Sequence, residues 1–241
     1  MSFQRQATLL IVWDFDYSLI NCNSDTFVPE SCLPSLHDFI AEGAKTTQWT
    51  KLMSQVAMKL YEAGVKRVDI EDSLEKMPIF SEVVSSIQLT HSQNAQQLIL
   101  SDANTIYISH FLKSKGLEEH FSSIISNPAT WTDQGLLQIN PYHSHHSCSR
   151  CPTNLCKGLV MDTIIHKARS MSSDYRILYI GDGEGDFCPC LRLQKHDVVA
   201  ARSGYRLAKL LKDADALEAS VLNWVDGSTL SQIITSFLKN V

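Results

Sequence analysis

The stretch TLLIVWDFDYS, residues 8–18, is the strongest indication of the fold of this 241-residue chain. Thr8 to Trp13 is a short, continuous apolar run, which indicates a strand buried on both faces of a parallel sheet. Asp14 and Asp16 follow directly, so two carboxylates stand at the carboxyl end of that strand. Because open α/β sheets bind their ligands at these strand ends, the stretch predicts a fold class and a site together.

Mostly helical sequence separates this strand from the next strand signal, Gln97 to Leu100. The helical patterns cover 35–64, 69–77 and 80–87. This separation of roughly 70 residues is far longer than the dozen or so that a parallel crossover needs. We therefore expect an inserted helical cap at 21–92, between core segments 1–20 and 93–241.

After Leu100, helices and strands alternate. We expect helices at 105–115 and from about 157, a hairpin at 131–139, and strands at 122–125, 176–180 and 197–201. Helices alone are expected to close the chain. This alternation predicts an α/β fold, a doubly wound Rossmann-like parallel sheet carrying the inserted cap.

A second acidic cluster, GDGEGD at 181–186, follows the strand expected at 176–180. If this strand neighbours the first one, Asp14, Asp16, Asp182 and Asp186 converge. Each cluster alone also suits an ordinary turn or helix cap, but their occurrence together favours a site. Crowded carboxylates resist ionisation unless a cation neutralises them, and Mg²⁺ prefers oxygen ligands. The sequence therefore predicts a magnesium cofactor.

These residue types suit phosphoryl transfer. Asp14 can attack phosphorus to form an aspartyl-phosphate, and Asp16 can protonate the leaving alcohol and later deprotonate a water. Ser101, with the amides of the helix start that follows it, is expected to hold phosphoryl oxygens, although it equally suits helix capping. Lys157 would bring positive charge to the developing charge on the phosphoryl group.

In this order, residues 14–18, Ser101, Lys157 and 181–186 resemble the four motifs of the haloacid-dehalogenase-like (HAD) phosphatase superfamily. Ser18 stands where that superfamily usually has threonine, and the hydroxyl is kept. The resemblance implies a HAD-like core with a helical cap of the C1 type.

A narrower resemblance is to the PHOSPHO-type family. It is carried by SDAN (101–104), NP (127–128), PYH (141–143), CSRCP (148–152), NLCKG (154–158) and GDGEGDFCP (181–189). That family includes phosphoethanolamine/phosphocholine phosphatases, a pyridoxal phosphate phosphatase, and plant relatives that act on thiamine monophosphate or pyrophosphate.

The narrower resemblance also implies roles for individual residues. Mg²⁺ would be bound by the Asp14 side chain, the Asp16 backbone carbonyl and Asp182, while Asp186 would support these ligands without binding the ion itself, or through water. Asp25 and Asp102 match positions that face the substrate, and Asn104 belongs to the same SDAN segment. Two carboxylates beyond the phosphate site would favour a cationic head group, although Asp25 equally suits helix capping.

The favoured function is a magnesium-dependent phosphatase that hydrolyses a small phosphomonoester. Phosphoethanolamine, phosphocholine, thiamine monophosphate and pyridoxal phosphate are the expected substrates. The first alternative is an inorganic pyrophosphatase on the same machinery, and a less favoured one is a catalytically inactive, zinc-stabilised binding module. Transfer of the phosphoryl group to an acceptor other than water also stays open.

A histidine- and cysteine-rich segment offers possible zinc ligands, namely His143, His145, His146, Cys148, Cys151 and Cys156. No second Cys-x-x-Cys follows at finger-like spacing, and Cys188 and Cys190 complete no known framework. We therefore favour buried free thiols over structural zinc. A redox dithiol is less favoured still, because the Cys-x-x-Cys does not open a helix after a strand.

Charge and composition narrow the remaining classes. The net charge of -5 argues against a nucleic-acid partner, because such proteins usually carry a basic face. The apolar run from Leu9 to Trp13 is far shorter than the ~20 residues of a membrane span, and it leads into acidic residues rather than a signal-peptide cleavage site. Seven cysteines in a chain of this length suggest reduced thiols and a cytoplasmic location. The oligomeric state stays open.

Overall fold

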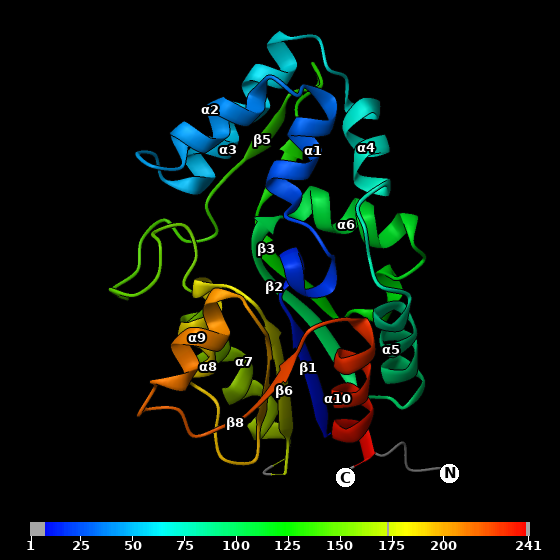
Figure 1. Cartoon of the computed structure of the whole chain (residues 1–241), viewed down its shortest axis with the longest axis vertical. Coiled ribbons are helices and arrows are strands. Elements are labelled where there is room, and N and C mark those ends of the chain that lie inside the picture. Colours follow the sequence, from blue (N-terminus) through cyan, green and yellow to red (C-terminus); the bar gives the residue numbers. More distant parts are fainter. Residues whose placement is uncertain (1–7, 173, 240–241) are drawn as a thin grey trace.

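A six-stranded parallel sheet forms the centre of the computed structural model, which describes residues 8–172 and 174–239 (Figure 1). The strand order is β3-β2-β1-β6-β7-β8, and every neighbouring pair is parallel. The strands are β1 Leu9–Trp13, β2 Gln96–Asn104, β3 Ser123–Asn127, β6 Arg176–Gly181, β7 Val198–Arg202 and β8 Ser220–Trp224. The predicted α/β fold with a doubly wound parallel sheet is confirmed.

β1 lies in the middle of the sheet because both of its faces are apolar. Ile11 and Trp13 pack into the core on one face, and Leu10 and Val12 pack into the core on the other. β2 and β6 flank β1 on opposite sides, so the order of the strands reverses here. The carboxyl end of β1 is therefore the switch point at which such sheets bind ligands.

Helices cover both faces of the sheet (Figure 1). Helices α5, α6 and α10 contribute to the core on the face of Ile11 and Trp13, and α7, α8 and α9 contribute to the other. Their bounds are α5 Ser81–Ser92, α6 Thr105–Ser114, α7 Lys157–Met171, α8 Phe187–Cys190, α9 Arg206–Lys212 and α10 Gly227–Lys239. Among the described residues, no helix combines the length and apolar character that crossing a bilayer requires.

Four further helices extend beyond the carboxyl end of the sheet, at the top of Figure 1. They are α1 Ser24–Cys32, α2 Leu36–Gly43, α3 Trp49–Glu62 and α4 Arg67–Glu75. The hairpin of β4 (Ala129–Trp131) and β5 (Leu137–Ile139), which the sequence predicts, lies beside α3. The Ser54 hydroxyl of α3 donates to the Ile139 carbonyl at 3.1 Å. Residues far from the insertion therefore pack against its helices.

Some elements differ from the sequence predictions. The helical pattern at 35–64 is two helices, and α1 was not predicted. The prediction that helices alone close the chain is wrong, because β8 lies between α9 and α10. As an edge strand, β8 buries only Trp224 and shows no apolar run. The division into core and cap stays a prediction. Because α5 packs on α10 and contacts β2, we propose that the cap ends before α5.

Candidate active site

A cavity of about 340 Å³ opens at the carboxyl ends of the central strands. Most of the side chains that line it are acidic. Among the described residues that line it, Lys157 is the one basic residue. The lining residues are Asp14, Asp16, Tyr17, Asn23, Asp25, Trp49, Asp102, Lys157, Asp182, Gly183, Glu184, Gly185 and Asp186. The structure thus brings together all the predicted site residues except Ser101 and Asn104.

Lys157 joins the two acidic clusters. Its Nζ donates to Asp14 Oδ1 at 2.6 Å and to Asp186 Oδ1 at 2.8 Å, and all three side chains are buried. Burial lowers the pKa of Lys157, but the charges of Asp14 and Asp186 outweigh it and raise the pKa well above its usual value. A fixed ammonium group therefore stands beside the predicted nucleophile.

Asp186 organises the turn that presents Asp182. Its Oδ2 accepts from the backbone amides of Asp182 and Gly183, at 3.1 and 3.0 Å, and its Oδ1 also accepts from the Tyr179 hydroxyl at 2.7 Å. A Cβ at Gly181 would lie 2.6 Å from the Asp186 carboxyl carbon, so only glycine fits there. Bonds to the protein thus occupy both oxygens of Asp186, which suits its predicted supporting role.

Asp14, Asp182 and Asp186 each bring an oxygen within 4.8 Å of the others. Burial and the charge of Asp186 raise the pKa of Asp14 to about 7. Burial and the charge of Asp14 raise the pKa of Asp182 to about 9. A divalent cation would relieve this repulsion, and carboxylate oxygens are ligands that Mg²⁺ prefers. In donor type and spacing, Asp14 and Asp182 fit magnesium, and Asp186 lies beside them.

Asp16 follows Asp14 in a short irregular turn, Phe15–Leu19, where Tyr17 adopts a left-handed conformation with φ 53°. The Ser24 backbone amide donates to Asp16 Oδ1 at 2.8 Å and holds the carboxyl in the cavity. Burial, followed by the charge of Asp25, raises the pKa of Asp16 well above its usual value. The protonated form, which can give a proton to a leaving group, is therefore favoured.

Side chains from the insertion and from the core meet in the same cavity. Asp25 comes from α1 and Trp49 from α3, and the Trp49 indole donates to Asp25 Oδ2 at 2.8 Å. Asp102, from β2, lines the same cavity. Burial raises the pKa of Asp25 to about 7, and the charge of Asp102 contributes to the shift. The helical pattern had placed Trp49 on an apolar face, with no indication of a role in the site.

Ser101 and Asn104 do not line the cavity. Ser101 is fully buried within β2, because the strand continues to Asn104 instead of ending at Leu100, and its Oγ accepts from the Ala103 amide at 3.3 Å. Asn104 caps α6 by accepting from the Tyr107 amide at 3.0 Å. Contact between either side chain and the phosphoryl group therefore stays a proposal.

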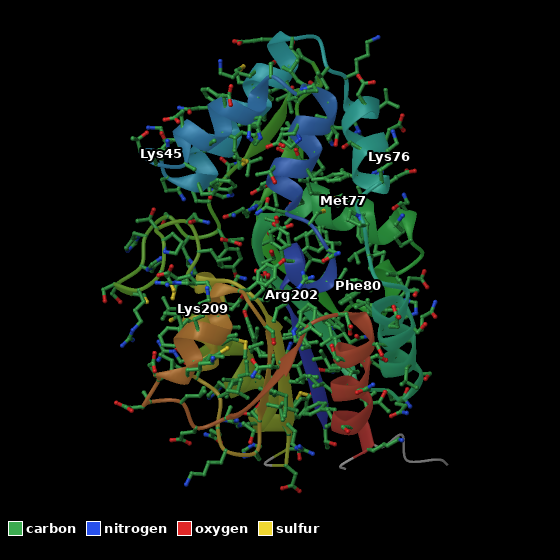
Figure 2. The ribbon with its side chains drawn as sticks, viewed as in Figure 1. Lys45, Lys76, Met77, Phe80, Arg202 and Lys209 are labelled. Atoms are coloured by element: carbon green, nitrogen blue, oxygen red, sulfur yellow. The ribbon has the colours of Figure 1, made fainter. Side chains whose placement is uncertain are left out.

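Arg202 supports the turn that carries Asp16, and the sequence reasoning missed it. The guanidinium donates to the Tyr17 carbonyl at 2.7 Å and to Asn21 Oδ1 at 2.5 Å. It also stacks 4.7 Å from the Tyr205 ring and lies near Phe80 (Figure 2). The sequence signal that could have revealed it is an arginine directly after the strand predicted at 197–201, where the parallel sheet places its ligands.

Comparison with known proteins places the chain in a family. A sequence-family model described as "Putative Phosphatase" matches residues 9–238. A thiamine phosphate phosphatase-like protein of Arabidopsis thaliana is 37% identical, over 98% of this chain and 97% of that protein. The chain belongs to the PHOSPHO family of phosphatases.

Other PHOSPHO-family relatives carry different substrate names. Inorganic pyrophosphatase 2 of Arabidopsis thaliana is 32% identical, over 98% of this chain and 86% of that protein. Pyridoxal phosphate phosphatase PHOSPHO2 of Mus musculus is 35% identical, over 96% of this chain and 99% of that protein. Membership of the family therefore shows that the chain is a phosphatase, but the names of its relatives do not identify one substrate.

The fold of this PHOSPHO-family protein is shared with HAD hydrolases. The crystal structure of the HAD family hydrolase t0658 from Salmonella enterica serovar Typhi superposes with a TM-score of 0.61 at 12% identity, covering 93% of this chain and 70% of that chain. The HAD-like fold expected from the sequence motifs is confirmed.

Proposed function

We propose that this protein is a magnesium-dependent phosphatase that hydrolyses a small phosphomonoester with a cationic group, through a phospho-aspartate at Asp14. One observation carries the proposal: the Lys157–Asp14 pair and the Asp25–Trp49 pair line the same cavity. The first pair suits attack on phosphorus, and the second suits recognition of positive charge.

In the first half of the reaction, Asp14 attacks phosphorus. Because Lys157 holds Asp14 Oδ1, the Oδ2 oxygen is left to form the bond to phosphorus. The P–O bond to the alcohol breaks, and protonated Asp16 gives its proton to the leaving oxygen. Mg²⁺, held by Asp14 and Asp182 with the Asp16 backbone carbonyl, would neutralise charge on the phosphoryl oxygens.

In the second half, the phospho-aspartate is hydrolysed. Asp16, now a carboxylate, takes a proton from a water molecule, whose oxygen attacks phosphorus. The acyl phosphate bond breaks, which releases inorganic phosphate and restores the Asp14 carboxylate. The Lys157 ammonium stays paired with Asp186 throughout, so its positive charge remains fixed beside the reacting group.

The part of the cavity lined by Asp25, Trp49 and Asp102 fits a positively charged group. Asp25 and Asp102 supply carboxylates, and Trp49 adds an aromatic ring beside them. Aromatic rings and carboxylates attract ammonium, thiazolium and pyridinium groups. Two relatives are named for thiamine phosphate and pyridoxal phosphate. Thiamine phosphate contains a thiazolium ring, and pyridoxal phosphate contains a pyridine ring that can be protonated. Pyrophosphate offers no positive group, so this lining disfavours the pyrophosphatase alternative.

A substrate screen tests the proposed function. The purified protein is assayed in Mg²⁺ with phosphoethanolamine, phosphocholine, pyridoxal phosphate, thiamine monophosphate and pyrophosphate. We expect a phosphomonoester with a cationic group to give the highest kcat/KM. A kcat/KM for pyrophosphate above that of every monoester would overturn the substrate assignment and favour the activity named for one Arabidopsis thaliana relative.

Removal of the acidic group of Asp25 or of Asp102 should lower the preference for cationic substrates. In Asp25→Asn and in Asp102→Asn, we expect kcat/KM for the best cationic substrate to fall about tenfold or more, equivalent to about 1.4 kcal/mol. The kcat/KM for p-nitrophenyl phosphate, which has no cationic group, should change little. Asp38→Asn, at an exposed position on α2, is the matched control. Equal losses for both substrates would contradict a role in selectivity.

Magnesium and calcium should have opposite effects on turnover. After desalting into metal-free buffer, we expect activity to disappear, to return with Mg²⁺, and to stay low with Ca²⁺. Mg²⁺ requires near-octahedral coordination, whereas Ca²⁺ takes six to eight ligands at longer distances and would spoil the in-line geometry. Initial rates across a titration of each ion provide the measurement. Full activity in Ca²⁺ alone would count against the magnesium assignment.

A further inference from the structure

Four cysteine side chains outside the phosphatase site form a compact cluster. The Sγ atoms of Cys148, Cys151, Cys156 and Cys188 all lie within 4.8 Å of one another. Cys148 and Cys151 come from the loop before α7, Cys156 is the N-cap of α7, and Cys188 lies in α8. Cys188 is thus the fourth cysteine of the cluster, and only the fold brings it beside the Cys-x-x-Cys segment.

The spacing of the sulfurs suits a tetrahedral metal site. With zinc–sulfur bonds of about 2.3 Å, the sulfurs of a tetrahedral site lie about 3.8 Å apart. The Sγ atoms of Cys148 and Cys188 are 3.8 Å apart. Four thiolates in a tetrahedral arrangement are typical of zinc and iron–sulfur sites, and Cys₄ is a common ligand set of structural zinc. Each thiol would release its proton to solvent as zinc binds.

The surroundings of the cluster suit a negatively charged metal–thiolate group. The Leu159 backbone amide, in the first turn of α7, donates to Cys156 Sγ at 3.5 Å. Positive partial charge at this helix start favours thiolates. A Cβ at Gly158 would lie 2.4 Å from Cys188 Sγ and 3.4 Å from Arg192 Nε, so the backbone approaches closely and a guanidinium lies near by.

The loop that supplies two of the cysteines is long and lies at the surface. Residues 140–156, all of them described by the structure, contain no helix or strand, and most side chains up to residue 153 are exposed or half-buried (Figure 1, yellow-green). Loops of this length without secondary structure are uncommon in compact domains. A metal that joins the loop to α7 and α8 would stabilise its conformation.

The histidines of the same segment make other contacts. His143 Nδ1 accepts from the Cys156 backbone amide at 3.1 Å, and His146 Nε2 lies 2.8 Å from the Pro152 carbonyl. These bonds lie within the loop and at its junction with α7. The ligand set suggested by the sequence, which counted histidines and left Cys188 aside, is therefore replaced by four cysteines.

We propose that Cys148, Cys151, Cys156 and Cys188 bind one structural zinc ion, which fixes the loop before α7 and two groups of the phosphatase site. Cys156 immediately precedes Lys157, and Cys188 lies two residues after Asp186. The zinc ion therefore anchors both ends of the 2.8 Å bond between Lys157 and Asp186. The site is separate from the carboxylates that fit Mg²⁺, and it replaces the earlier preference for free thiols.

Metal analysis of the full chain tests the proposal. The protein is produced with a tag that binds no metal, purified without added zinc, and measured by inductively coupled plasma mass spectrometry. We expect about one zinc per chain in the wild type, as in four-cysteine sites. Cys148→Ser and Cys188→Ser should lose the zinc and melt at lower temperature. Cys190→Ser, which alters a buried cysteine outside the cluster, should retain it.

Two measurements on proteins with all four thiols keep the test decisive if the serine variants fail to fold. Cobalt exchanged into the wild type should show the intense visible bands of tetrahedral thiolate coordination, and a mercurial thiol reagent should release the zinc. Asp14→Asn should keep its zinc, which separates this site from the phosphatase site. Absence of zinc, disulfides among these cysteines in the non-reduced protein, or zinc lost in Asp14→Asn would each overturn the proposal.

Discussion

Asp14→Asn should lose nearly all turnover while the protein keeps its fold. A carboxamide does not attack phosphorus, so no phospho-enzyme can form, and we expect kcat to fall on the order of 10⁴-fold or more. Stability should change little, because burial and Asp186 already disfavour the ionised Asp14 and raise its pKa to about 7. Lys157 also keeps its bond to Asp186 in the variant.

Acid quenching with substrate labelled in the phosphoryl group provides the decisive measurement. The wild type should retain label in the peptide that contains Asp14, and Asp14→Asn should retain none. Asp133→Asn, in the exposed turn of the β4–β5 hairpin, is the control and should match the wild type in both rate and labelling. Substantial residual activity in Asp14→Asn would refute the covalent mechanism.

Lys157→Met should destabilise the fold and also abolish activity. Lys157 is the partner of two buried carboxylates, so its removal leaves Asp14 and Asp186 without a positive charge. Breaking a buried ion pair in this way costs about 3–5 kcal/mol. We expect the free energy of unfolding, measured by urea denaturation in metal-free buffer, to fall by about this amount. Lys209→Met, at an exposed lysine on α9, is the control (Figure 2).

The double variant Lys157→Met/Asp186→Asn separates stability from catalysis. Replacing Asp186 removes one of the carboxylates that Lys157 had neutralised, so part of the lost stability should return. Activity should not return, because the positive charge beside Asp14 is still missing. If Lys157→Met unfolded at the same urea concentration as the wild type, the buried ion pairs would contribute nothing to the fold.

Local sequence features predict the centre of the fold and most of the chemistry. The run from Leu9 to Trp13 is apolar at every position, and a strand of this kind is stable only inside a sheet covered on both faces. The acidic residues after it, and the GDGEGD turn at 181–186, therefore had to stand at strand ends. These are local properties, because each follows from residues adjacent in the chain.

The bounds of strands that depend on a neighbouring strand were harder to predict. β8 carries little apolar signal because it is an edge strand, and it exists because β7 offers a hydrogen-bonding edge. β2 continues beyond Leu100 to Asn104, which moved Ser101 from a helix start into the strand. Neighbouring strands decided both outcomes, and no short window of sequence contains their positions.

Tertiary packing was needed to add Trp49 to the phosphatase site and Cys188 to the cysteine cluster. Trp49 and Asp25 meet Asp102 because the inserted helices extend beyond the carboxyl end of the sheet. Cys188 joins the cysteines before α7 because α7 and α8 pack on the same face of that sheet. Both contacts result from the packing of helices and strands, which is driven by the burial of apolar faces over many residues. No single residue or spacing in the sequence specifies that packing.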